Sequence, residues 1–195
     1  MRTFSLSPRS FGIAEGETML EIARDLASKI RVLVLDVDGV LTNAHLVLGP
    51  SGEELKEFSV RDGIGIIMAQ FAGIDVIFLS ARVSEIVKMR AEMLGVKELY
   101  QGEQQKLDVV KRIASQKEMG LDEIAYVGDD LVDMASIDAV GVGVAVGDAC
   151  RDLLESASFI TEAYGGRGAV RETVEAILRG RGDWDEISRS FLESI

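Results

Sequence analysis

The chain has 195 residues, 47% of them hydrophobic and 28% charged, and its formal net charge is −12. This composition suits one folded domain with a sizeable core and excludes an intrinsically disordered protein. A strongly acidic surface repels nucleic acid and anionic lipid, so we expect neither as a partner. The single cysteine, Cys150, has no partner for an internal disulfide, and residues 1–12 carry no apolar run of signal-peptide length. We therefore expect a cytoplasmic protein.

Apolar segments of strand length alternate with segments of helical periodicity along most of the chain. Residues 1–15 suggest loose order, and residues 17–30 predict a short amphipathic helix. Strands are expected at 31–36, 74–79, 97–100, 123–127, 142–146 and 157–160. Helices are expected at about 63–72, 84–94, 103–118, 131–138, 149–155 and 168–180. This alternation predicts an α/β fold, a Rossmann-like three-layer sandwich with a mainly parallel sheet. The longest apolar region, 64–79, is interrupted by polar residues and does not predict a membrane span.

Residues 43–60 interrupt the alternation of strands and helices. Two short extended runs flank the turn sequence "GPSG", which predicts a β-hairpin. The hairpin follows the first strand directly, so it should project above the carboxyl end of that strand, where open parallel sheets hold their active sites. We expect no separate cap domain. The chain then divides into an N-terminal extension (1–30), a main domain (31–180) and a tail (181–195) that forms a terminal helix or a mobile arm.

The first predicted strand ends in two aspartates, Asp36 and Asp38, followed by Gly39. Residues i and i+2 of a strand point the same way, so the two carboxylates should repel each other unless a cation or proton lies between them. The alternative is a turn in which an aspartate hydrogen-bonds the local backbone. A glycine at the third position allows the backbone to approach a ligand closely.

A second apolar strand ends in "GDDLVD", with Asp129, Asp130 and, one helical turn on, Asp133. Parallel strands deliver both acidic groups to one edge of the sheet, where an oxygen-rich site suits a hard cation such as Mg²⁺. The alternative is that Asp129 or Asp130 caps the next helix. We expect one of the two to cap as well as to serve the site.

One further strand end and the start of one predicted helix carry residues that could bind phosphate. Ser80 ends the strand "IDVIFLS" with Arg82 two positions on, and a hydroxyl with a backbone N–H there can hold a phosphate oxygen. Ser84 is the expected cap of the following helix. Lys106 lies in the first turn of another predicted helix, where a cation is unfavourable for the helix dipole. It is either a solvated surface lysine or the cation that neutralises a phosphoryl group.

These motifs, in this order at strand ends, resemble the haloacid dehalogenase superfamily of phosphotransferases. The finer resemblance is to the 3-deoxy-D-manno-octulosonate 8-phosphate phosphatase family. It is carried by "GEELKEFSVRDG" (52–63), "YQG" (100–102), "YVGDDL" (126–131) and "GGRGAVRE" (165–172). The resemblance spans about residues 31–180 and implies a phosphoric monoester hydrolase.

The resemblance implies that Asp36 attacks phosphorus and forms an aspartyl-phosphate, with Asp38 as general acid and then general base. Mg²⁺ would be held by the carboxylates of Asp36 and Asp129 and by the backbone carbonyl of Asp38. Lys106 would bind a phosphoryl oxygen. The remaining implied site residues are Ser80 for the phosphoryl group and Asp130 and Asp133 as groups that orient Asp129 or a metal-bound water.

The family pattern also implies contacts with the sugar acid. Arg82 and Arg90 would grip a carboxylate bidentately, although ordinary surface charge is the alternative for Arg90. Arg167 lies in a glycine-rich segment that suits a flexible lid. The segment "SVRDG" would supply Ser59, Val60, Arg61, Asp62 and Gly63, with surface charge again the alternative for Arg61.

Relatives without a cap domain form homotetramers in which a neighbouring subunit covers the site, so we expect the same assembly here. The apolar hairpin residues would then be partly interface. The substrate alternatives are a nonulosonate (sialic-acid type) 9-phosphate and a broader range of sugar phosphates. A non-catalytic oligomeric module is a remote alternative, because Asp36, Asp38, Lys106 and Asp129 are all present.

Overall fold

A six-stranded sheet forms the centre of the molecule, and the computed structural model describes residues 20–194 of the chain. In their order across the sheet, the strands are β5 (Glu98–Gln101), β4 (Asp75–Ser80), β1 (Val32–Asp36), β6 (Ile124–Gly128), β7 (Val142–Ala145) and β8 (Phe159–Ile160). Every neighbouring pair of strands is parallel. The predicted α/β fold with a parallel sheet is therefore confirmed.

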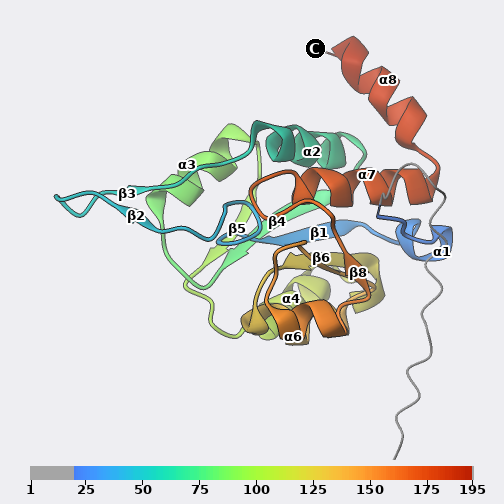
Figure 1. Cartoon of the computed structure of the whole chain (residues 1–195). Coiled ribbons are helices and arrows are strands. Elements are labelled where there is room, and N and C mark those ends of the chain that lie inside the picture. Colours follow the sequence, from blue (N-terminus) through green and yellow to red (C-terminus); the bar gives the residue numbers. More distant parts are fainter. Residues whose placement is uncertain (1–19, 195) are drawn as a thin grey trace, which may run out of the picture.

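Helices cover both faces of this sheet and give the three layers expected from the sequence. The helices are α1 (Arg24–Ala27), α2 (Val60–Phe71), α3 (Glu85–Met93), α4 (Lys106–Gln116), α5 (Met134–Ala139), α6 (Arg151–Ser156), α7 (Ala169–Arg181) and α8 (Trp184–Ser194). Helices α2, α3 and α7 lie on one side of the sheet and α4 and α6 on the other (Figure 1). Among residues 20–194, no helix is long and apolar enough to cross a membrane.

Several predicted helix boundaries differ from the structure, three of them for reasons that the local contacts and backbone show. The helix expected over 17–30 is reduced to the single turn α1, with Ala23 extended before it (φ −58°, ψ 144°), while residues 1–19 lie outside the described part. Helix α2 begins earlier than predicted because the Ser59 side chain accepts the N–H of Asp62 at 3.2 Å. The segment 131–138 contains a 3-10 turn (Leu131–Asp133) before α5.

The strand order reverses between β1 and β6. The chain passes from β1 to β4 and β5 in one direction, then returns to β6 on the opposite side of β1. All five residues of β1 are buried between β4 and β6, which explains its uninterrupted apolar run up to Asp36. In such sheets the crevice for a ligand lies beyond the carboxyl ends of the strands where the order reverses. The fold thus directs attention to Asp36 and the residues that follow β6.

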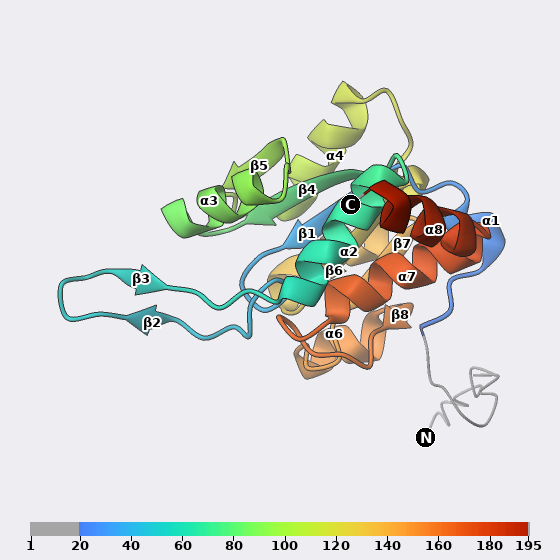
Figure 2. The ribbon, with the colours of Figure 1, turned by 90° about the horizontal axis from the view of Figure 1, so that it is seen from above.

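The predicted hairpin is present and stands away from the body of the molecule (Figure 2). Strands β2 (Val47–Leu48) and β3 (Glu54–Leu55) are antiparallel, with Val47 opposite Leu55. Its large apolar side chains are exposed rather than packed, Leu48 at 62% and Leu55 at 58%. Within residues 20–194 no second domain is inserted, so the expectation of a capless fold is confirmed.

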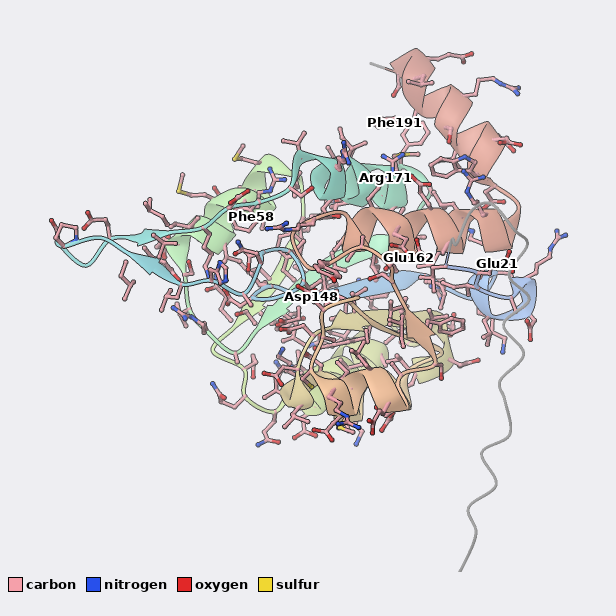
Figure 3. All side chains as sticks on the ribbon, in the orientation of Figure 1. Glu21, Phe58, Asp148, Glu162, Arg171 and Phe191 are labelled. Atoms are coloured by element: carbon pink, nitrogen blue, oxygen red, sulfur yellow. The ribbon has the colours of Figure 1, made fainter. Side chains whose placement is uncertain are left out.

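The C-terminal tail forms a helix, which decides between the two predicted forms. Helix α8 packs on α2 and α7, where Phe191, labelled in Figure 3, meets Phe71 edge to face at 5.9 Å between ring centroids. The Trp184 ring lies under the guanidinium groups of Arg171 and Arg179, at 5.5 and 4.6 Å from its centroid. Cation–π and aromatic contacts therefore hold the tail against α2 and α7.

A buried aspartate connects α2 to α7. Asp62 is 1% exposed, and its two carboxylate oxygens accept the N–H groups of Gly168 (3.1 Å) and Arg171 (2.9 Å). The first N–H groups of a helix have no partner inside the helix, so an outside acceptor satisfies them. Asp62 therefore caps α7 from a neighbouring helix and positions the glycine-rich loop before it.

We expect Asp62→Ala to lower the free energy of unfolding by about 1–3 kcal/mol, because two partly buried backbone N–H groups lose their acceptor. Urea denaturation followed by circular dichroism measures this loss. Asp122→Ala is the matched control, since Asp122 is 62% exposed and forms one surface ion pair with Lys29. The control should change stability by less than about 0.5 kcal/mol. Equal losses in both variants would contradict the capping role.

Candidate active site

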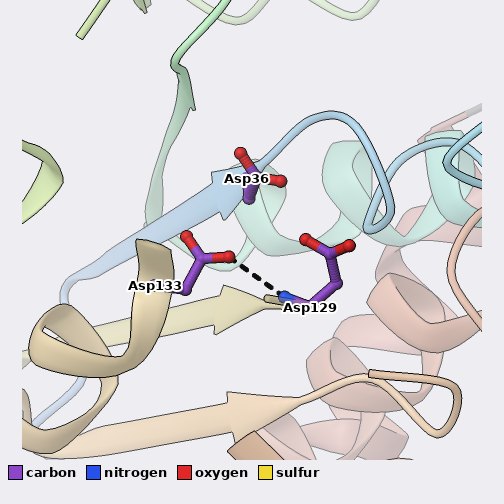
Figure 4. Close-up of side chains that lie close together, drawn as sticks. All are labelled: Asp36, Asp129 and Asp133. Atoms are coloured by element: carbon purple, nitrogen blue, oxygen red, sulfur yellow. Dashed lines mark hydrogen bonds between the residues drawn. The ribbon is translucent and has the colours of Figure 1, made fainter. Parts of the chain in front are cut away.

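Acidic side chains from β1 and β6 meet at the carboxyl edge of the sheet (Figure 4). Asp36 is the last residue of β1, and Asp129 follows the last residue of β6. Together with Asp133 they offer carboxylate oxygens that all lie within 4.8 Å of one another. The sequence predicted that these acidic strand ends would meet, and in the structure they do.

Burial and the crowding of like charges raise the pKa of both carboxyl groups that face the site. Burial, together with the charge of Asp133, raises the pKa of Asp36 to about 7, although Lys106 opposes the shift. Burial and the charges of Asp36 and Asp133 raise the pKa of Asp129 to about 8. Carboxyl groups with such pKa values need a proton or a cation near neutral pH. Their oxygen atoms fit a hard cation such as Mg²⁺, with Asp36 and Asp129 as the carboxylates that could hold it.

Lys106 is buried among these carboxylates rather than solvated. Its side chain is 2% exposed, and its Nζ lies 2.6 Å from Oδ1 of Asp36 and 2.7 Å from Oδ1 of Asp133. Burial lowers the pKa of Lys106, but the charges and hydrogen bonds of Asp36 and Asp133 outweigh it and raise that pKa. The lysine is therefore a fixed cation beside Asp36, which excludes the alternative of an ordinary surface residue.

Asp133 holds the other members of the site in place. It accepts the hydroxyl of Tyr126 at 2.6 Å and the backbone N–H groups of Asp129 and Asp130 at 3.1 and 3.3 Å. Burial and the charge of Asp133 raise the pKa of Tyr126 well above its ordinary value, so the hydroxyl keeps the proton it donates. Tyr126 was not singled out from the sequence, where it reads as one more core residue of a buried strand.

Asp129 and Asp130 have separate tasks. The Asp130 side chain is exposed and accepts the N–H of Leu131 at 2.8 Å, so it caps the 3-10 turn. The Asp129 side chain instead faces Asp36 across the end of the sheet (Figure 4). A Cβ added at Gly39 (φ +106°) would lie 1.9 Å from Oδ2 of Asp129, so only glycine lets the loop after β1 approach this carboxylate.

Asp38 is held by a lysine from the hairpin. The Nζ of Lys56 contacts Oδ1 of Asp38 and lies 3.3 Å from Oε1 of Glu54. The Lys56 side chain is 1% exposed, whereas that of Asp38 is 28% exposed. Lys56 was not singled out from the sequence, because a lysine in a hairpin usually lies in solvent. The only available signal was its place in the quoted segment "GEELKEF".

Comparisons with known proteins agree with this geometry. Residues 76–171 match the model of haloacid dehalogenase-like hydrolases. The 3-deoxy-D-manno-octulosonate 8-phosphate phosphatase of Escherichia coli (strain K12) is 42% identical over 160 residues, which are 82% of this chain and 85% of the relative. The chain belongs to this phosphatase family.

Solved structures of this phosphatase family share the fold. The crystal structure of the enzyme from Yersinia pestis matches with a TM-score of 0.81 and 39% identity, over 84% of this chain and 88% of that one. The structure from Moraxella catarrhalis, in complex with magnesium ion, phosphate ion and KDO, matches with a TM-score of 0.84 and 32% identity. That match covers 86% of this chain and 97% of the Moraxella chain.

The residues expected to bind phosphate and sugar lie around β4 and α3. The buried Ser80 hydroxyl accepts the N–H of Arg82 at 3.1 Å. The Arg82 guanidinium donates to Glu54 of the hairpin at 3.0 Å. Ser84 precedes α3, but its side chain does not cap that helix; its hydroxyl donates to Glu54 at 2.8 Å. Ser84 therefore occupies the predicted N-cap position, but the capping hydrogen bond expected from its side chain is absent.

The segment 59–63 opens α2 in this phosphatase-family chain. Arg90 donates to the Ser59 carbonyl at 3.1 Å and lies 5.5 Å from the centroid of the Phe58 ring. Val60 and Arg61 are exposed, whereas Asp62 and Gly63 are buried in the packing of α2 against its neighbours. In the single chain, Asp62 and Gly63 are therefore packing residues and are not exposed to a ligand.

Arg167 is exposed in a loop that is held by backbone hydrogen bonds. Gly165 N–H donates to Oδ1 of Asp148 at 2.8 Å, and Gly166 N–H donates to the Val40 carbonyl at 2.8 Å. A Cβ at Gly165 would lie 1.7 Å from the Gly39 carbonyl oxygen. The glycine-rich loop thus packs directly on the loop that follows β1, and Arg167 projects from it.

We expect Asp129→Asn to stabilise the magnesium-free protein at pH 8 by about 1–3 kcal/mol, because it removes one of the crowded charges. The pKa of Asp129 is raised from 3.8 to about 8, so its protonated form contributes stability fully below pH 3.8 and loses it as pH rises through about 8. The gain should therefore be small at pH 4. Urea denaturation in EDTA at both pH values measures it.

Urea denaturation in the presence of Mg²⁺ instead of EDTA tests whether Asp129 is a metal ligand. Added Mg²⁺ should stabilise the wild type at pH 8 but have little effect on Asp129→Asn, because a ligand stabilises only the state that binds it. Asp130→Asn is the matched control, since the exposed neighbour of Asp129 caps a turn outside the acidic group. Equal stabilisation of wild type and Asp129→Asn would remove Asp129 as a ligand.

Proposed function

We propose that this chain hydrolyses 3-deoxy-D-manno-octulosonate 8-phosphate to the free sugar acid and phosphate, with Mg²⁺ as cofactor. The name of the Escherichia coli relative and the Moraxella catarrhalis complex with magnesium ion, phosphate ion and KDO support this substrate and cofactor. The observation that carries the proposal is the buried Lys106 ammonium 2.6 Å from Asp36, beside the facing carboxylate of Asp129. This arrangement provides a nucleophile, a fixed cation and a metal site at one sheet edge.

Asp36 is the nucleophile of the proposed reaction. Its carboxylate oxygen attacks phosphorus as the bond to the sugar oxygen breaks, and an aspartyl-phosphate forms. Lys106 favours the ionised form of Asp36 and offers hydrogen bonds to the transferred phosphoryl oxygens, together with Ser80. When bound by Asp36, Asp129 and the Asp38 carbonyl, Mg²⁺ reduces the repulsion between nucleophile and phosphate.

Asp38 transfers the protons. It donates a proton to the leaving sugar oxygen in the first step and accepts one from the attacking water in the second. Asp133 fixes Lys106 and the backbone at Asp129, so it orients the site without touching substrate. Asp130 supports the same turn as a cap.

We assign the sugar-acid carboxylate to guanidinium groups near α3, chiefly Arg82 and Arg90, with Arg167 and the first residues of segment 59–63 at the rim, while Asp62 and Gly63 support that segment from within. Arg82 is bound to Glu54 in the structure, so a substrate carboxylate would compete with or join this pair. The catalytic unit is the domain of residues 31–180, preceded by the extension of residues 1–30 and followed by the tail of residues 181–195.

The assembly we propose is a cytoplasmic homotetramer in which hairpins associate and a neighbouring subunit completes the site. The exposed apolar side chains of the hairpin support association, since such patches mark interaction surfaces. One cysteine in the chain supports a reducing compartment. The exposed members of the patch are Leu46, Val47, Leu48 and Leu55.

We expect light scattering coupled to size exclusion to give the mass of four chains for the wild type and a smaller mass for Leu48→Glu. A charge at this exposed position opposes burial of the hairpin between subunits. Glu57→Gln, an exposed change outside the apolar patch, is the control and should keep the wild-type mass. A wild-type monomer, or a Leu48→Glu tetramer of unchanged stability, would contradict this assembly.

Phosphate release tests the function. With Mg²⁺, we expect the octulosonate 8-phosphate to show a kcat/KM at least about tenfold above that of a nonulosonate 9-phosphate and of hexose and pentose phosphates, because the carboxylate must pair with placed guanidinium groups. Similar kcat/KM values for all these substrates would retain phosphatase chemistry but reject the named substrate.

Asp36→Asn should abolish turnover without altering fold or assembly, because it removes the nucleophile. An active Asp36→Asn variant would show that Asp36 is not the nucleophile.

A further inference from the structure

The hairpin rejoins the body of the protein through a buried lysine. Lys56 directly follows β3, and its side chain is 1% exposed although its backbone lies at the surface. Burial of an ammonium group costs hydration and side-chain freedom, so it persists only where opposite charges compensate it. Two carboxylates do so here: Asp38, which Nζ contacts directly, and Glu54 at 3.3 Å.

Glu54 links this lysine to the opposite side of the site. Its carboxylate accepts hydrogen bonds from the Arg82 guanidinium at 3.0 Å and from the Ser84 hydroxyl at 2.8 Å. Although burial raises the pKa of Glu54, hydrogen bonds from Ser84 and Lys56 hold it below its ordinary value, so Glu54 stays ionised. A continuous chain of charge-assisted contacts therefore runs from Asp38 through Lys56 and Glu54 to Arg82.

We propose that Lys56 is a positioning residue for Asp38 and that Glu54 holds Lys56 in its turn. The inference rests on the proposed function, in which Asp38 exchanges protons with the leaving oxygen and with water. Lys56 fixes the orientation of the Asp38 carboxylate, and the hairpin thereby contributes to the chemical step.

The two aspartates of the loop need different means of orientation. Asp36 ends a buried strand and is held by Lys106 within the sheet edge. Asp38 lies beyond the strand, and its side chain is 28% exposed, so the sheet alone leaves it free to rotate. Proton transfer requires a donor–acceptor distance of about 2.6–3.2 Å, and a carboxylate that samples several rotamers spends less time at that distance. Lys56 removes this freedom.

Three variants test the positioning role. We expect Lys56→Met to lower kcat about 10- to 100-fold with KM changed less than about threefold, because the lost orientation affects proton transfer rather than binding. Lys56→Arg keeps the charge and should recover at least about half of that loss on a logarithmic scale. Lys88→Met, at an exposed lysine of α3, is the matched control and should keep the wild-type kcat.

Three further readouts separate positioning from a structural effect. Added to Asp38→Asn, Lys56→Met should cost less than about threefold more, because residues that act as a unit are non-additive. Glu54→Gln should lower kcat in the same direction as Lys56→Met. With p-nitrophenyl phosphate, whose leaving group needs little protonation, the Lys56→Met loss should be smaller than with the sugar phosphate. A structural effect would lower both rates equally.

The outcomes decide between the proposals. A raised KM with an unchanged kcat in Lys56→Met would assign Lys56 to substrate binding and overturn the inference, as would losses that add fully to Asp38→Asn. Wild-type turnover of p-nitrophenyl phosphate without turnover of any sugar phosphate would contradict the proposed function alone. The effect of Lys56→Met on kcat with the aryl ester, and its non-additivity with Asp38→Asn, would still decide the role of Lys56.

Discussion

The ammonium group of Lys106 between Asp36 and Asp133 is the interaction on which the site depends. Three carboxylates within 4.8 Å of one another repel each other, and burial together with this repulsion raises the pKa of Asp36 and of Asp129. Lys106 offsets part of it at 2.6 and 2.7 Å, in a place that water does not reach. The negative charge left over is what makes the edge of the sheet suitable for a divalent cation.

This constraint explains why distant parts of the chain must meet with little tolerance. Lys106 comes from the start of α4, Asp36 from β1 and Asp133 from the turn after β6. Parallel pairing of β1 with β6 sets the distance between the carboxylates of Asp36 and Asp129. The Tyr126 hydroxyl orients the carboxylate of Asp133. A buried ion pair is costly unless all its partners are satisfied. The sheet therefore supplies order that loops alone would not give.

The fold and the metal side of the site could be predicted from the sequence, because both follow from strand ends. Apolar runs that stop at Asp36 and at Gly128 predict where parallel strands place their acidic residues. Contacts made by side chains across the fold were not predictable. The sequence left Lys106 as either a solvated lysine or a cation for a phosphoryl group and did not predict its burial, while Tyr126 and Lys56 carry no local sign of their polar partners. Ser84 was expected to cap α3; it does precede that helix, but its hydroxyl donates a hydrogen bond to Glu54 of the hairpin instead of making a capping bond.

The hairpin joins two properties that would otherwise be separate. Its outer part exposes Leu46, Val47, Leu48 and Leu55, whereas its base buries Lys56 against Asp38. A two-residue ladder is too short to be stiff on its own, since isolated hairpins are marginally stable. If neighbouring hairpins associate as proposed, burial of the outer part restricts the same segment that carries Lys56. Assembly and orientation of Asp38 would then be thermodynamically linked, and each would strengthen the other.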